Sequence, residues 1–503
     1  MTAPPDSTPT AGERWPSMLT RLLISSVGLP VIWLLSGRSI GVPGQWTWEV
    51  RDRELTLAPV AVVVLIGVAI MGAVVLGMRG IRRRQRSDAL VVAGLVVLVF
   101  ALQWAVVGLA DEGTFKLIAS TASPVSTEYF TVAWELTDPW EFCRGYADVL
   151  ADNRYHHVAT HPPGAVLFYW LCIGICPDRF FEDIATVAVG VHPDLIASLA
   201  SEIRGVSMVT EQVGPALFSC AVLGLCAALV LVPLHALARS LAGRRVALLA
   251  CGLYALAPAP ILFFQGLDAL IALLALTAIA LAHSALDRGC WGRGAAAGIV
   301  LALACFISFG AVAAVGVTAV YAALYTLRAG PAARRTLLWV GVAGAVGFIV
   351  TMGIEHFICG GRLPAIFTQA MASHREFTWV EHSRTYLTWL GMNPLEFAWF
   401  MGLPVCVIIG YAIRRLLAEG GTRGSTLGLA ALAVLALLVV SGSVRGEVGR
   451  VWLLLMPPLI IWAACWLSAD APRKRSLACI LGCLMLVQLL VMGATLTPVV
   501  MPY

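Results

Sequence analysis

The sequence has few charged residues. Asp, Glu, Lys and Arg together make up 13% of its 503 residues, about half the share of ~25% that is typical of soluble domains. Hydrophobic residues make up 59%, and they repeat in runs of about 18 to 22 residues, the length that crosses the hydrocarbon core of a bilayer. The composition therefore excludes a soluble globular protein and predicts an all-α polytopic membrane protein.

Two further features carry less information than their numbers suggest. The formal net charge is +5, but the basic residues lie in short clusters between apolar runs, so they do not indicate a nucleic-acid partner. Most of the 13 cysteines, such as Cys220, Cys251 and Cys305, lie inside apolar runs. We interpret them as small buried hydrophobic residues and not as a disulfide framework.

The apolar runs predict about 13 transmembrane helices. The predicted spans are 20–36, 58–78, 89–110, 205–236, 246–264, 268–286, 294–309, 311–327, 336–356, 396–413, 426–441, 451–468 and 476–499. The basic clusters at 79–86, 239–245, 328–335, 414–415 and 473–475 all fall on one side in this scheme. The positive-inside rule makes that side cytoplasmic. The N-terminus is then predicted to be cytoplasmic and the C-terminus extracytoplasmic.

Two long polar segments are predicted on the extracytoplasmic side. Residues 111–204 form the first, and its amphipathic, aromatic stretches predict short helices along the membrane surface. Residues 357–395 form the second. Residues 1–19 are polar and rich in Pro and Thr, so we expect a disordered cytoplasmic tail. The remainder, 20–503, is predicted to be a single transmembrane domain.

Three stretches in this order suggest a family. They are "STEYFTVAWEL" at 126–136, "HPPG" at 161–164, and the long run 237–281, in which a basic turn, a span, an acidic turn and a second span follow one another. In order, spacing and sidedness the chain resembles the GT-C superfamily of membrane glycosyltransferases, which includes protein O-mannosyltransferases and lipid A aminoarabinose transferases. The usual Asp-Glu pair of that family appears here as Thr127-Glu128, whereas a true pair occurs earlier, as Asp111-Glu112.

The resemblance implies a reaction on the extracytoplasmic face of the plasma membrane. A polyprenyl phosphate would donate the sugar, and a lipid, glycan or protein would accept it with inversion at the anomeric carbon. A carboxylate must take the proton of the attacking acceptor group. Glu128 is the first candidate for this base, and Asp111 and Glu112 are the alternatives. A carboxylate at Glu128 is also compatible with a simple helix start, where acidic residues are favoured.

Other residues are candidates for holding the substrates. Arginine is suited to a lipid phosphate because it donates several hydrogen bonds in a fixed plane. The candidates for substrate binding are His161, Arg450, Glu447, Asp268, His374 and Arg375. The spacing of His156, His157 and His161 does not make a ligand set, so no metal-binding residues are assigned. Whether a divalent metal ion takes part is left open, as is the identity of the sugar and the acceptor.

A transporter or flippase for lipid-linked sugars is the main alternative. Such proteins usually contain inverted repeats and ionisable residues in the middle of spans. The sequence shows no internal repeat, and its polar residues are concentrated in the two long loops. These features favour an enzyme over a carrier.

Overall fold

The computed structural model describes residues 11–48, 50, 56–79, 85–110, 112–124, 128–151, 157–204, 207–381, 383–420, 422–468 and 473–496. The described residues are almost entirely helical, which confirms the all-α prediction. The bundle consists of α1 (Ala11–Leu35), α2 (Leu57–Arg79), α3 (Gln85–Val107), α10 (Val213–Leu229), α11 (Leu231–Ala242), α12 (Arg244–Ala255), α13 (Pro258–Leu262), α14 (Asp268–Arg288), α15 (Trp291–Ile307), α16 (Val312–Arg328), α17 (Pro331–Ile358), α20 (Leu403–Glu419), α21 (Arg423–Ser441), α23 (Met456–Ser468) and α24 (Arg473–Thr495).

The shorter elements lie mainly in the connections. The first long loop contains α4 (Gly113–Ala122), α5 (Tyr129–Glu135), α6 (Pro139–Ala151), the 3-10 helix η1 (Val158–Thr160), α7 (Gly164–Ile175), α8 (Asp178–Val189), α9 (Pro193–Arg204) and η2 (Thr210–Gln212). The remaining short elements are β1 (Ile40–Val42), β2 (Trp46–Trp48), η3 (Phe309–Ala311), α18 (Leu363–Arg375), the π-helix η4 (Glu376–Glu381), α19 (Tyr386–Met401), α22 (Val448–Val451) and η5 (Leu453–Leu455). The short helices predicted for 111–204 are therefore present.

Eight helices among the described residues are long and apolar enough to cross a membrane, or up to ten if each of two bent pairs counts as one span. Three shorter apolar helices, Leu19–Leu35, Trp291–Ile307 and Leu453–Ser468, come in addition. The prediction of a polytopic membrane protein is confirmed, whereas the count of 13 spans is not.

Two predicted spans are interrupted. The span predicted at 396–413 is not one straight helix, because α19 and α20 meet at Gly402 with a bend of 108°. Gly402 has a φ of +105°, a conformation that glycine adopts without steric penalty. The span predicted at 246–264 is divided into α12 and α13, since Pro258 opens a new helix and cannot continue the old one.

The N-terminal prediction is tested only in part. Residues 1–10 lie outside the described residues, and α1 begins at Ala11, inside the segment that we expected to be a disordered tail. A short antiparallel hairpin of β1 and β2 follows α1 and pairs Ile40 with Trp48. This hairpin was not predicted from the sequence.

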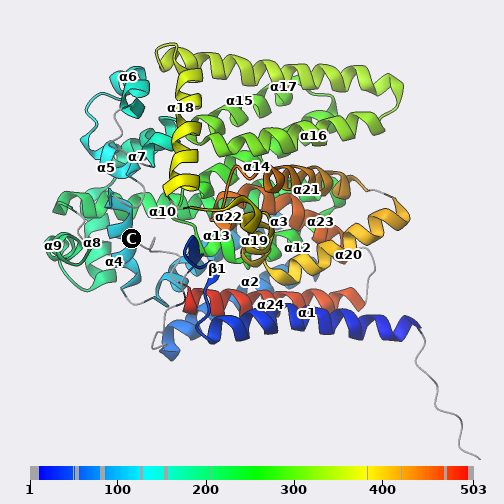
Figure 1. Cartoon of the computed structure of the whole chain (residues 1–503). Coiled ribbons are helices and arrows are strands. Elements are labelled where there is room, and N and C mark those ends of the chain that lie inside the picture. Colours follow the sequence, from blue (N-terminus) through cyan, green and yellow to red (C-terminus); the bar gives the residue numbers. More distant parts are fainter. Residues whose placement is uncertain are drawn as a thin grey trace, which may run out of the picture.

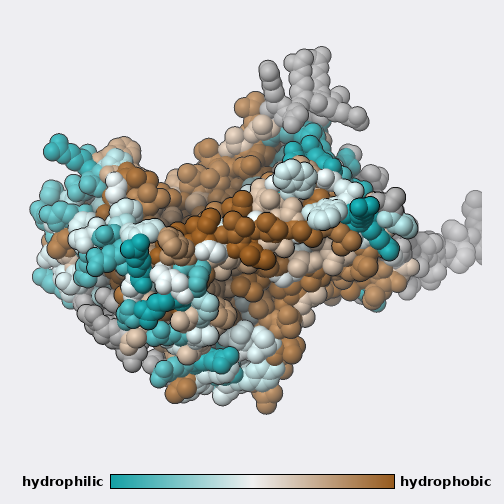
Figure 2. All heavy atoms as spheres, turned by 90° about the horizontal axis from the view of Figure 1, so that it is seen from above, coloured by the Kyte–Doolittle hydropathy of each residue, from teal (hydrophilic) through white to brown (hydrophobic). Residues whose placement is uncertain are grey.

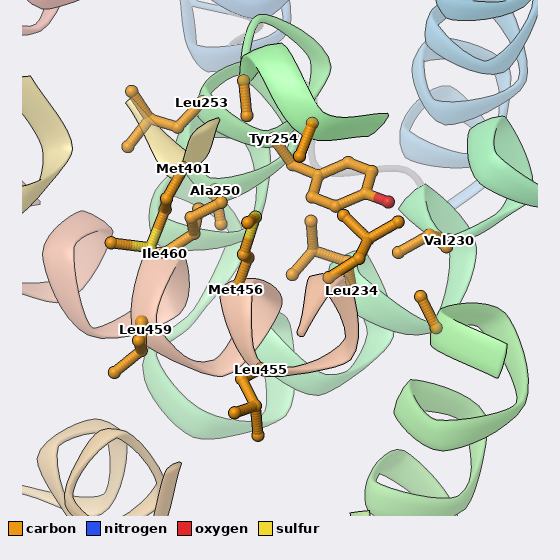
Figure 3. Packing of buried hydrophobic residues seen from close by; sticks show 14 of the residues in the cluster. Val230, Leu234, Ala250, Leu253, Tyr254, Met401, Leu455, Met456, Leu459 and Ile460 are labelled. Carbon is orange, nitrogen blue, oxygen red and sulfur yellow. The ribbon is translucent and has the colours of Figure 1, made fainter. Parts of the chain in front are cut away.

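Side chains and glycines hold the bundle together. Figure 3 shows part of the buried apolar cluster, to which α11, α12 and α23 contribute Leu234, Tyr254 and Met456. Between α15 and α17 the backbones themselves come close: a Cβ on Gly298 would lie 1.9 Å from the carbonyl oxygen of Gly344. Small residues commonly allow this close approach between helices in membranes.

The polar elements separate to the two ends of the bundle. In Figure 1 the long helices run across the view, and α4 to α9 gather at one end, which we name the loop end. The opposite, basic end contains Asp88, a buried carboxylate that pairs with Arg239 and Arg244. Figure 2 shows a broad hydrophobic region between hydrophilic surfaces at the two sides of the molecule. This arrangement suits a bilayer across the middle, with the first long loop on one side of it.

Candidate active site

Four segments that are far apart in the sequence meet at the loop end. The first long loop contributes Glu128, Tyr129 and His161, and the start of α14 contributes Asp268. The second long loop contributes α18 and Arg384, and α22 with the residue before it contributes Arg450 and Glu447. The contacts of η1 with α18, and of α14 with η5, bring these segments together. We call this group of side chains the charged cluster.

Glu128 ties α5 to η1. Its side chain is 5% exposed, and its Oε2 atom accepts hydrogen bonds from the backbone N–H groups of His157 (2.9 Å) and Val158 (3.2 Å). Its φ of +63° lies in the left-handed region, which a residue with a side chain adopts only at a cost in free energy. Such strained residues are concentrated at functional sites. The carboxylate is thus anchored through one oxygen at a fixed position.

His161 lies beside this carboxylate anchor in a network of neutral groups. Its Nδ1 atom is 2.9 Å from the hydroxyl of Tyr129 and 2.8 Å from the hydroxyl of Thr160. Burial, together with the neighbouring His157 and the charge of Arg450, lowers the pKa of His161 to about 3. The imidazole is therefore neutral at physiological pH. Burial likewise raises the pKa of Tyr129 well above its ordinary value, so its hydroxyl keeps its proton.

Arg450 is held between two carboxylates. Its Nε atom lies 3.3 Å from Oδ2 of Asp268, and its Nη2 atom donates to Oε2 of Glu447 at 3.0 Å. The other oxygen of Glu447 accepts from Nη2 of Arg384 at 3.2 Å. Although burial acts to raise it, the charges of Arg450 and Arg384 bring the pKa of Glu447 below its ordinary value. Glu447 is therefore ionised, and it fixes the planes of both guanidinium groups.

The hydrogen-bond network of His161 and the ion pairs of Arg450 lie close enough to interact electrostatically. The charges of Arg450 and Asp268 act on the hydroxyl of Tyr129, and the charge of Arg450 also acts on His161. His157, whose backbone binds Glu128, acts in turn on Glu447. A carboxylate, a guanidinium and two neutral hydrogen-bonding side chains are thus brought into one site.

The second long loop covers one flank of the cluster. Nε2 of His374 lies 3.0 Å from the carbonyl oxygen of Ser443, and burial lowers the pKa of His374. Arg375 is exposed and its guanidinium lies 5.7 Å from the ring centroid of Trp379. The guanidinium of Arg445 also lies over the Trp379 ring, at 4.2 Å from the centroid. Arg375 therefore sits at the rim of the site, whereas His374 lies closer to its centre.

The predicted site residues are brought together unevenly. Glu128, His161, Asp268, Glu447, Arg450 and His374 belong to the cluster or interact electrostatically with it. Glu112 is exposed at the start of α4, with a φ of +55°, and makes none of the contacts described above. Asp111 lies outside the described residues.

Sequence reasoning missed four contributors. Tyr129 and Thr160 contact His161, Arg384 contacts Glu447, and Glu396 contacts the turn that precedes Arg450. Of these four, Glu396 alone had a sequence signal: it is a glutamate at the edge of an apolar run, and acidic residues within membrane spans are rare and usually functional.

In the described part of the chain, no three or more His, Cys, Asp or Glu side chains are grouped so that they could hold a metal ion. Asp268 and Glu447, the acidic pair of the cluster, are instead bridged by Arg450. The participation of a divalent metal ion stays an open question.

Comparisons with known proteins give a likeness of fold only. No protein-family model matches the chain, and no curated protein sequence does. The structure is similar to the crystal structure of ArnT from Cupriavidus metallidurans in the apo state, with 16% sequence identity and a TM-score of 0.42, over 68% of this chain and 57% of that chain. It is also similar to the Archaeoglobus fulgidus oligosaccharyltransferase in complex with Zn and sulfate, with 14% identity and a TM-score of 0.31, over 71% of this chain and 49% of that chain.

The chain thus spans about half the length of the solved proteins that it matches. At TM-scores below 0.5 the two likenesses carry no argument about the reaction, so the case for an activity rests on the site.

Proposed function

We propose that the protein is an integral-membrane glycosyltransferase. It transfers a sugar from a polyprenyl-phosphate donor to a lipid, glycan or protein acceptor on the extracytoplasmic face of the plasma membrane. The observation that carries this proposal is the charged cluster itself: an anchored carboxylate, Glu128, lies in one site with a guanidinium, Arg450, at the end of an apolar bundle. A lipid-linked substrate would reach this site from the bilayer with its polar group at the loop end.

Arg450 is assigned to the donor phosphate. Asp268 and Glu447 hold its guanidinium in a fixed orientation, so that little conformational freedom is lost when an anion binds. Tyr129 and His161 are uncharged at neutral pH and can orient the sugar or the acceptor through hydrogen bonds. His374 and Arg375 lie on the side of the second loop, where we place the acceptor.

Glu128 is assigned as the general base. As the acceptor hydroxyl or amine attacks the anomeric carbon, Glu128 takes its proton. The bond from the anomeric carbon to the phosphate oxygen breaks on the opposite face of the sugar, and the polyprenyl phosphate leaves with the bonding electrons. A phosphate is a good leaving group at neutral pH, so no strong general acid is needed. The configuration of the anomeric carbon is inverted.

A transfer assay tests this proposal. Purified protein in lipid vesicles is supplied with radiolabelled polyprenyl-phosphate sugars and a membrane lipid extract as acceptor. We expect Glu128→Gln to lower the transfer rate by about 10²- to 10⁴-fold, the usual contribution of a general base. Glu135→Gln is the matched control, because Glu135 is exposed at the other end of the same helix.

Two further arms decide between the candidate bases and between the functions. If Glu128→Gln stays active while Asp111→Asn or Glu112→Gln is inactive, the base is in the earlier Asp-Glu pair. If the wild-type protein moves intact lipid-linked sugar across the bilayer and releases no polyprenyl phosphate, the glycosyltransferase proposal is wrong. The flippase then replaces it.

A further inference from the structure

Helix α19 binds the turn at 444–450, which contains Glu447 and Arg450. Asn393 is 1% exposed, and its side-chain amide donates to the carbonyl oxygen of Val444 (2.7 Å) and accepts from the N–H of Gly446 (3.0 Å). One helical turn further on, Oε1 of Glu396 accepts from the N–H of Gly449 (3.1 Å). The backbone of the turn is therefore fixed at both its ends by buried polar side chains.

The N-terminal hairpin reaches the same carboxylate. Nε1 of Trp48, in β2, donates to Oε1 of Glu396 at 3.1 Å. The indole ring of Trp48 packs against both Phe263 and Phe400, with centroid separations of 5.0 Å and 5.3 Å. One oxygen atom of Glu396 thus joins the hairpin, α19 and the turn before Arg450, three segments that are remote in the sequence.

A glutamate at position 396 lowers the stability of the folded protein. Glu396 is fully buried, and among the described residues its Oε2 atom has no hydrogen-bond partner. A buried polar atom without a partner destabilises a folded protein, whereas an apolar side chain of similar size would not. A carboxyl side chain at such a position indicates a task other than packing.

The turn itself needs support from outside. Glu447 has a φ of +61°, in the left-handed region that disfavours residues with a side chain. Gly449 presses against the ring of Phe400, and a Cβ at this position would lie 2.2 Å from it. The strained turn places Arg450 one residue after the amide that Glu396 binds. A small rotation of this turn would move the guanidinium away from Asp268.

We infer that Glu396 is a positioning residue for the donor-phosphate site: by binding the Gly449 amide, with Trp48 as its second partner, it holds the Arg450 guanidinium in its binding orientation. This inference rests on the proposed role of Arg450 in binding the donor phosphate. It assigns a function to the hairpin, which lies outside both long loops, and it makes the donor affinity dependent on a side chain that does not touch the donor.

The test measures donor affinity separately from turnover. Radiolabelled polyprenyl phosphate is titrated into full-length protein in detergent, and KM and kcat for the donor are measured in vesicles. We expect Glu396→Ala to weaken binding by about 10-fold and to raise KM equally, with little change in kcat, as for a lost binding interaction. Glu396→Gln keeps an oxygen acceptor and should bind within about 2-fold of the wild type. Trp48→Phe, which leaves the Gly449 contact in place, should fall between the two.

A matched control separates positioning from general stability. Gln488 is also a buried polar side chain of the bundle, and it holds the α19–α20 bend by donating to the carbonyl oxygen of Trp399 (2.7 Å). We expect Gln488→Ala to lower the melting temperature without changing the affinity for polyprenyl phosphate. If Glu396→Ala does not fold, Trp48→Phe and Glu396→Gln provide the comparison.

The outcomes are distinct. Unchanged affinity in Glu396→Ala and Trp48→Phe, with wild-type binding intact, would overturn the positioning role alone. So would a loss of affinity that Gln488→Ala reproduces at an equal drop in melting temperature. A wild-type protein that does not bind polyprenyl phosphate would overturn the proposed function together with this inference.

Discussion

Replacing Arg450 tests the site at its most connected residue. Its guanidinium joins Asp268 at 3.3 Å and Glu447 at 3.0 Å, and the three side chains are 23%, 19% and 17% exposed. In Arg450→Gln the two carboxylates lose their shared cation. Glu447 keeps Arg384 as a partner, whereas Asp268 loses the ion pair described here. The substitution therefore acts on both the fold and the binding of an anion.

The two effects have different sizes. Breaking a buried ion pair costs about 3–5 kcal/mol, and the partial exposure of these side chains reduces this to about 2 kcal/mol. A hydrogen bond to a charged group contributes about 1.5–3 kcal/mol. Loss of one such bond to the donor phosphate corresponds to a decrease in affinity of about 10- to 150-fold.

A double variant separates the two effects. Arg450→Gln combined with Asp268→Asn removes the unpaired carboxylate, so we expect much of the lost melting temperature to return. The affinity for polyprenyl phosphate, measured by titration of the radiolabelled lipid, should stay low in the double variant because the guanidinium is still absent. If affinity returns together with stability, Arg450 is only a structural ion-pair partner, and the assignment of the phosphate site is refuted.

Three further predictions concern other parts of the molecule. His161→Gln should make the fold less sensitive to acid. Because the pKa of His161 is lowered to about 3 in the folded protein, the unfolded state binds more protons below about pH 6.5, and the wild-type protein loses stability as the pH falls from there. The difference in melting temperature between the wild type and His161→Gln should therefore shrink from pH 7 to pH 5. Asp88→Asn should destabilise the basic end by about 3 kcal/mol, because Arg239 loses its buried partner, while the donor KM measured in vesicles stays unchanged. Gly449→Ala should lower the yield of folded protein in size-exclusion chromatography, since its methyl group would overlap the ring of Phe400, at a cost of about 1–3 kcal/mol or more.

The parts of the fold that could be predicted are those that depend on local sequence. Helices α2, α3, α14 and α21 follow from uninterrupted apolar runs of the required length. The bend at Gly402 was not predictable in this way, because the sequence around it is as apolar as a span. The bend depends on a positive φ at Gly402 and on the packing of Met485 against it. Such contacts between distant segments leave no periodic signal.

The candidate site could likewise be predicted only where it depends on local sequence. Glu128, His161, Asp268 and Arg450 are polar residues in segments that the spans place on one side, and this made each of them a candidate. Their proximity depends on how the two loops fold back on the bundle, which no local pattern records. Glu396 was not predicted as a site residue because it occupies the first position of a predicted span, where a terminal charge is common.

In the proposed reaction, the charged cluster breaks a bond between a sugar and a lipid phosphate. The most direct measurement is the release of polyprenyl phosphate from a doubly labelled donor by wild-type protein and by Glu128→Gln in the same vesicles. We expect equal amounts of released lipid phosphate and newly glycosylated acceptor from the wild type, and a loss of both products in the variant. Equal release by wild type and variant, or no release while intact donor crosses the bilayer, would contradict the proposed function.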